Sequence, residues 1–185
     1  MSQTIPPPNS SAPVRTWQNA VGKYLPDLIF GANDGIITTL AVVSGVVGAS
    51  LSATVILILG FANLLADGFS MGVSNVLSRR SDVEAATLPP LRDVAMHGVA
   101  TFTGFVLAGI VPLISYLVPV FAGVRFEAAT ALALVTLFVI GASRAVFTTR
   151  GWLVSGVEML LLGALAAVVA YSVGATVANL VGSTP

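Results

Sequence analysis

Two aspartates interrupt long apolar stretches of this chain, and their chemistry needs an explanation first. Asp34 lies in LIFGANDGIITTLAVVSGVVGA and Asp67 in ILILGFANLLADGFSMGVSNVL. A carboxylate at membrane depth is costly unless it faces a partner, a water-filled cavity or a bound cation. The pair therefore predicts a site that handles cations or protons.

Oxygen groups and one sulfur accompany Asp67 along the same predicted helix. The residues that share one face at four-residue spacing are Asn63, Asp67, Met71 and Asn75, flanked by Ser70, Ser74 and Ser78. This donor set suits a divalent cation of intermediate softness, such as ferrous iron or manganese, better than it suits magnesium. Two alternatives stay open: Met71 as a packing residue, and the two asparagines as interhelical hydrogen-bonding groups.

A histidine and a glutamate lie at a similar depth in later apolar segments. Glu158 could add a metal ligand or carry a proton, or it could pair with Arg144 or Arg150 near the membrane interface. His97 could relay protons near neutral pH. A lone histidine at a helix start more often bonds locally or faces lipid headgroups, and we favour that interpretation.

The composition is that of an integral membrane protein. Of the 185 residues, 56% are hydrophobic and 9% are charged, and the mean hydropathy is +0.95. We expect an all-α fold with five transmembrane helices, which form one transport domain over residues 26–185. The predicted spans are about 28–49, 52–78, 93–118, 126–147 and 152–181. A disordered tail is predicted over 1–13. For residues 14–25, a short interfacial helix and a frayed extension of the first span are equal alternatives.

The basic residues predict how these helices are oriented in the membrane. Seven of the eight flank the spans on one side, and Arg125 lies on the other. Because basic loops stay in the cytoplasm, the N terminus is predicted to be cytoplasmic and the C terminus to lie on the opposite side. A hairpin about Ser50 and Leu51 then places Asp34 opposite Asp67, in the cytoplasmic half of the membrane.

Small residues four apart recur in several spans, which is typical of closely packed membrane helices. The pairs are Gly31 with Gly35, Gly68 with Gly72, and Gly104 with Ala108. These faces could pack within one chain or against a second subunit. We also predict that Gly31, Gly35, Gly45 and Pro112 act as flexible points during helix movement.

The chain resembles the vacuolar iron transporter family. The segments that carry the resemblance are DGIITTLAVVSGVVGA and GFANLLADGFSMGVSNVLSRRS in the first two spans, FTGFVLAGIVPLISYLV in the third and GVEMLLLGALAAVVAYSVG in the fifth. They cover nearly the whole chain from Pro26 onward. The resemblance implies five-helix subunits that pair as a homodimer, with proton-coupled movement of ferrous iron or manganese out of the cytosol along the dimer interface.

Carried over by position, the resemblance makes Asp34 the essential aspartate of the first span and Met71 the metal-contacting methionine of the second. Plant and yeast-type members often have a glutamate where this chain has Asn63. The segment ANLLADGFSM is similar to the bacterial branch, so we expect a bacterial plasma membrane. Because Asn63 stands in place of that glutamate, we hypothesise that the ligand has moved to Asp67 in this chain.

The largest departure from the family lies between the second and third spans. Many members insert a glutamate-rich cytoplasmic domain there that captures metal before transport. Here the connection is only SRRSDVEAATLPPLRD, in which two prolines break any long helix and three arginines repel cations. That capture site is absent, which leaves manganese or a broader divalent range open beside iron.

We therefore expect an exporter of Fe²⁺ or Mn²⁺ that works by proton antiport in the lipid bilayer and holds no permanently bound cofactor. Its metal site would comprise Asp34 and Met71, with Asp67 and Asn63 nearby. Two other classes stay open, a divalent cation channel without proton coupling and a structural membrane module that does not transport. An enzyme is not expected, because the chain has one histidine, no cysteine and no nucleophile motif. A nucleic-acid partner is not expected either, since basic residues are few and scattered.

Overall fold

The computed structural model describes residues 16–81, 90–146 and 151–182, which are almost entirely helical. The long helices are α1 (Thr16–Gly48), α2 (Ala53–Ser81), α3 (Leu91–Leu117), α4 (Arg125–Ser143) and α5 (Trp152–Gly182). Two short 3₁₀ turns, η1 (Pro119–Phe121) and η2 (Arg144–Val146), follow α3 and α4. Each long helix contains a stretch long and apolar enough to cross a membrane. The predicted all-α fold with five such helices is confirmed.

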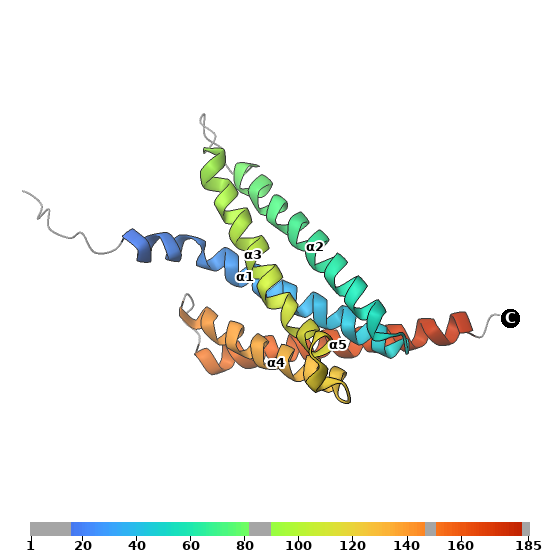
Figure 1. The fold of residues 1–185 in the computed structure, drawn as a ribbon. Coiled ribbons are helices and arrows are strands. Elements are labelled where there is room, and N and C mark those ends of the chain that lie inside the picture. The colour runs from blue at the N-terminus through green and yellow to red at the C-terminus, as the bar shows by residue number, and fades with distance from the viewer. Residues whose placement is uncertain (1–15, 82–89, 147–150, 183–185) are drawn as a thin grey trace, which may run out of the picture.

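Helix α1 is the centre of the bundle, because it packs against each of the other four long helices. Figure 1 shows α2 and α3 running side by side on one flank of α1, and α4 and α5 paired on the other. The buried apolar core follows α1 on both flanks, through Ile36, Leu40 and Val43. The contacts of α1 therefore hold the two helix pairs, α2 with α3 and α4 with α5, in one bundle.

The first span is longer than predicted, since α1 runs without interruption from Thr16 through Pro26 to Gly48. Residues 16–25 thus belong to the same helix as the span that follows them. Whether they lie along the membrane surface stays a prediction. The predicted tail over residues 1–13 lies outside the described residues.

A tight turn joins α1 to α2 where the sequence predicts it. Ser50 has φ of 57°, the left-handed conformation in which many helices end. The N–H of Ser50 donates to the carbonyl of Val47 over 2.9 Å, and that of Leu51 to Val46 over 3.1 Å. These bonds close the C-terminal end of α1 and turn the chain back, so α1 and α2 run antiparallel.

The glycine pairs bring helices of the same chain into close contact. A Cβ atom on Gly31 or Gly35 would collide with the α3 backbone at Thr101 or Phe105. Gly68 and Gly72 likewise face α3, where the Phe102 side chain lies against both. Of the two alternatives for these small residues, packing within one chain is the one the structure shows.

Candidate functional site

A polar groove of about 530 Å³ runs between α1 and α2 at the end where α1 begins and α2 ends. Its lining consists of Asp27 and Phe30 from α1 and of Met71, Ser74, Asn75, Ser78 and Arg79 from α2. Met71 and Asn75 of the predicted α2 stripe, with the flanking Ser74 and Ser78, therefore face a real groove, whereas Asn63 and Asp67 do not line it. Hydroxyl, amide and thioether groups share it with one buried carboxylate.

The two aspartates that first marked the site lie just beyond this groove. Asp67 is one helical turn before Met71 on α2, and Asp34 is two turns beyond Asp27 on α1. The carboxylates of Asp34 and Asp67 are near enough to repel one another electrostatically. Asp34 is half-buried and Asp67 is exposed. The antiparallel hairpin thus brings together the pair that the sequence placed opposite one another.

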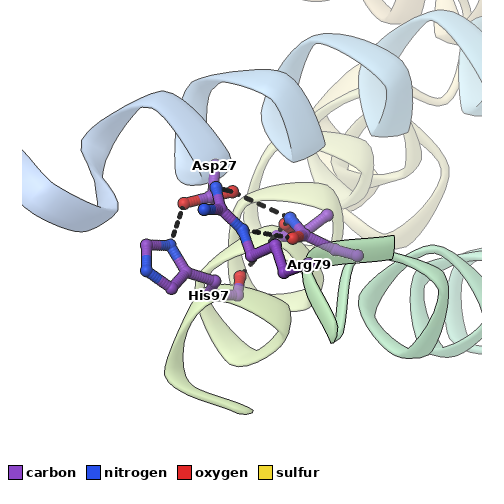
Figure 2. A network of polar contacts seen from close by, with 5 residues as sticks. Asp27, Arg79 and His97 are labelled. Atoms are coloured by element: carbon purple, nitrogen blue, oxygen red, sulfur yellow. Dashed lines mark hydrogen bonds and ion pairs between the residues drawn. The ribbon is translucent and has the colours of Figure 1, made fainter. Parts of the chain in front are cut away.

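Asp27 is a buried carboxylate whose hydrogen-bond partners come from α2 and α3 (Figure 2). Its Oδ1 accepts from Arg79 Nη2 and from Asn75 Nδ2, each over 2.8 Å. Its Oδ2 lies 2.6 Å from His97 Nδ1, a geometry in which the ring N–H donates to the carboxylate. A carboxylate whose side chain is 6% exposed is thereby fully partnered.

A second set of contacts fixes the partners of Asp27 in turn. Asn75 Nδ2 also lies 2.7 Å from Thr101 Oγ1, and its Oδ1 accepts from Arg79 Nε over 2.8 Å. The ring of Tyr24 meets His97 edge-on, with 4.8 Å between the ring centroids. Three helices are therefore joined at one polar cluster, which comprises Asp27, Asn75, Arg79, His97 and Thr101.

Sequence reasoning missed Asp27, because the residue precedes the predicted first span, which begins at about residue 28. One signal was available. Asp27 precedes Asp34 by seven residues, two helical turns, so both carboxylates share a face of α1. What the spacing could not show is that an arginine, an asparagine and a histidine from other helices converge on it.

The structure contradicts our expectation for His97 and shows one of the two alternatives for Asn75. His97 is buried and bonds to a residue 70 positions away, so it neither bonds locally nor faces headgroups as we expected. The reason is that α1 crosses α3 at this level and supplies a buried carboxylate partner. Asn75 shows the alternative left open for it, an interhelical hydrogen-bonding group.

The remaining predicted residues lie apart from the polar cluster. Asn63 is half-buried on α2, one turn from Asp67 on the side of the hairpin turn. Glu158 is exposed on α5, in a shallow groove whose lining residues belong to α5. Pro112 is buried in α3, where its carbonyl accepts from Ser115 Oγ over 3.0 Å. Among the described residues, no three His, Asp or Glu side chains converge into a ready metal cage.

Comparison with known proteins places this architecture in a family. The model of the VIT family matches residues 25–89 and 87–175. The chain belongs to the VIT family. The vacuolar iron transporter of Toxoplasma gondii is 26% identical over 235 residues, which covers 89% of this chain and 78% of that protein. The one from Plasmodium falciparum is also 26% identical, over 84% of this chain and 82% of that protein. Vacuolar iron transporter 1 of Eucalyptus grandis is 23% identical, over 84% and 87%.

These matches confirm the resemblance inferred from the sequence motifs, and with the five apolar helices they make the VIT-family chain an integral membrane protein. The two parts of the family match meet at residues 87–89, in the connection between α2 and α3. The alignment with the Toxoplasma protein spans 235 residues and so exceeds the 185 of this chain, which means that it opens gaps here.

Proposed function

We propose that this VIT-family chain is a membrane transporter that exports a divalent transition metal, Fe²⁺ or Mn²⁺, from the cytosol in exchange for protons. The observation that carries the proposal is a pair of carboxylates, Asp34 and Asp67, on adjacent antiparallel helices of a bundle that is otherwise strongly apolar. Intramembrane carboxylates mark ion and proton paths in transport proteins. The names of the relatives, vacuolar iron transporters, agree with this chemistry.

The donors near the pair favour a transition metal over a hard cation. Met71 lies one turn from Asp67 along α2 and lines the groove, so a thioether is available one helical turn from a carboxylate of the pair. Sulfur and carboxylate together suit Fe²⁺ or Mn²⁺, whereas Mg²⁺ requires oxygen ligands in a strict octahedron. We propose that Asp34, Asp67 and Met71 bind the cargo and that Asn63 adds an amide oxygen.

Exchange with protons follows from the repulsion between the two carboxylates. A bound divalent cation relieves that repulsion, and so does a proton, so metal and proton compete for the same oxygens. We propose that metal loaded from the cytosol is released on the far side as protons replace it. Movement between the two states would involve the helices that carry Gly31, Gly35 and Pro112.

The proposed setting follows the charge bias of the sequence. The end of the bundle with Lys23, Arg79 and Arg92 would face the cytosol, in a bacterial plasma membrane. Two copies would form a homodimer, so that each α1 and α2 pair contributes to one shared path. Cross-linking of the purified protein at low concentration in lipid would test the dimer, and a purely monomeric result would contradict it.

Flux through purified protein in liposomes tests the function. We expect Fe²⁺ and Mn²⁺ uptake to depend on Asp34, to drive proton movement in the opposite direction, and to rise with an imposed pH gradient. Asp34→Asn should abolish metal-dependent flux, whereas Glu127→Gln, a carboxylate in the first turn of α4, should retain it. Flux that ignores the pH gradient and moves no protons would indicate a channel. A protein without any Asp34-dependent flux would not be a transporter.

A further inference from the structure

Arg79 reaches from the last turn of α2 across the groove to α1. Its guanidinium donates to Asp27 and to Asn75 and forms part of the groove lining. The arginine side chain is 42% exposed, whereas that of Asp27 is 6% exposed. One partner of this ion pair is therefore partly exposed, and the other is buried in the lining of the groove.

The buried partner would keep its position without the arginine. Asp27 Oδ2 is bonded to His97 on α3, and Oδ1 also accepts from Asn75, which is itself held by Thr101. The side chain of Arg79, by contrast, is long and flexible and is 42% exposed as a whole. Breaking the pair would therefore move the arginine and leave the carboxylate fixed and directed at the groove.

Helix α1, which carries Asp27, also contains a position at which its backbone hydrogen bonding is interrupted. Pro26 lies inside α1 and has no N–H, so the carbonyl four residues earlier, at Gly22, lacks its helical hydrogen bond. Helices bend most readily at such positions. Asp27 directly follows this position, so the bond to Arg79 joins α2 to α1 next to the point where α1 bends most readily.

We propose that the Asp27–Arg79 pair is an ionic latch that closes the end of the α1/α2 groove next to the basic helix ends. While closed, it neutralises Asp27 and occupies the end of the groove that leads to Met71, which lies two turns deeper along α2. When Arg79 leaves, the free carboxylate draws a cation into the groove. The role of the latch in transport rests on the function proposed above, whereas the latch itself can be tested without measuring transport.

Cysteine labelling provides that test, because the natural chain contains no cysteine. Met71→Cys places a reporter behind the latch, and Ser78→Cys places one at the mouth, beside Arg79. Each full-length protein is put into lipid nanodiscs, where both faces are accessible, and treated with a charged, membrane-impermeant maleimide. We expect Arg79→Gln to speed labelling at position 71 about tenfold, the change that ~1.4 kcal/mol produces in an equilibrium, and to leave labelling at position 78 unchanged.

Two further variants separate a latch from a general effect of charge or stability. Arg80→Gln removes the neighbouring positive charge, outside the groove lining, and should leave the labelling rate at position 71 as it is. Asp27→Asn breaks the same pair from the other side, so it should speed labelling as Arg79→Gln does, and the double variant should add nothing more. Arg79→Lys, which keeps the charge, should restore slow labelling in part.

An unchanged rate at position 71 in Arg79→Gln would overturn the latch. So would an equal acceleration in Arg80→Gln, or additive effects of the two latch variants. If Arg79→Gln fails to fold, the Asp27→Asn protein and Arg79→Lys decide the question by the same comparison. No metal flux enters this experiment, so its failure is distinguishable from failure of the transport proposal, which depends on Asp34.

Discussion

Adding one methyl group at Gly35 should weaken the contact between α1 and α3 on which the site depends. An ideal Cβ at this position would lie 2.8 Å from both the carbonyl carbon and the Cα of Phe105, and closer still to its carbonyl oxygen. All three are backbone atoms, so no side-chain rotation can relieve the overlap. Because carbon atoms pack at about 3.5–4.0 Å, Gly35→Ala requires the helices to separate by about 1 Å.

The cost of that separation can be estimated against a matched control on the same helix. Phe105 and Ile36 are fully buried where α1 meets α3, and a gap of about 0.5–1 Å forfeits a quarter to a half of each contact's dispersion energy. Overpacked cores typically lose about 1–3 kcal/mol. Gly45→Ala gains the same helix propensity, but its Cβ would lie an acceptable 3.4 Å from the Ala170 carbonyl oxygen. We therefore expect Gly35→Ala to be about 1–3 kcal/mol less stable than Gly45→Ala.

Thermal unfolding in detergent, followed by size-exclusion chromatography of the heated samples, measures this difference. At roughly 2–4 °C per kcal/mol for a chain of this length, the midpoint of Gly35→Ala should lie several degrees below that of Gly45→Ala. Equal midpoints would show that α1 and α3 do not approach as closely as described. Flux should fall in parallel, because Gly35 adjoins Asp34.

Three further outcomes are expected. Asp67→Asn should fold normally yet lose most metal flux, since one half of the carboxylate pair is gone; unchanged flux would remove Asp67 from the site. His97→Ala should cost about 1–3 kcal/mol by leaving an oxygen of buried Asp27 without a donor, and a midpoint equal to that of the parent would argue against the bond. Phe105→Ala, at a fully buried position, should cost about 3–5 kcal/mol, whereas Phe69→Ala, which is 67% exposed on α2, should cost far less.

The sequence predicted the helices well because the membrane imposes a simple rule on it. A span must hold about twenty apolar residues and satisfy its backbone internally, so composition and length suffice to find it. The turn at Ser50 followed from the boundary between two such segments. The antiparallel hairpin then made Asp34 and Asp67 neighbours, because two helices that rise equally from one turn bring equally distant residues to the same level.

The polar cluster around Asp27 could not be found in this way. It joins residues of α1, α2 and α3, and its bond between Asp27 and His97 links positions 70 residues apart. Periodicity describes one helix at a time, whereas the approach of α1 to α3 depends on which glycines face which backbone. For the same reason the sequence left open whether the small residues pack within the chain.

The sequence by itself determined the membrane class, the five apolar helices and the two carboxylates that interrupt them, because each of these is a local cost or gain of placing residues in lipid. Only the tertiary structure decided which of the polar residues meet. It brought Asp27, Arg79 and His97 together because α1 crosses between the helix pairs at glycine contacts, and no repeat along a single helix encodes that crossing.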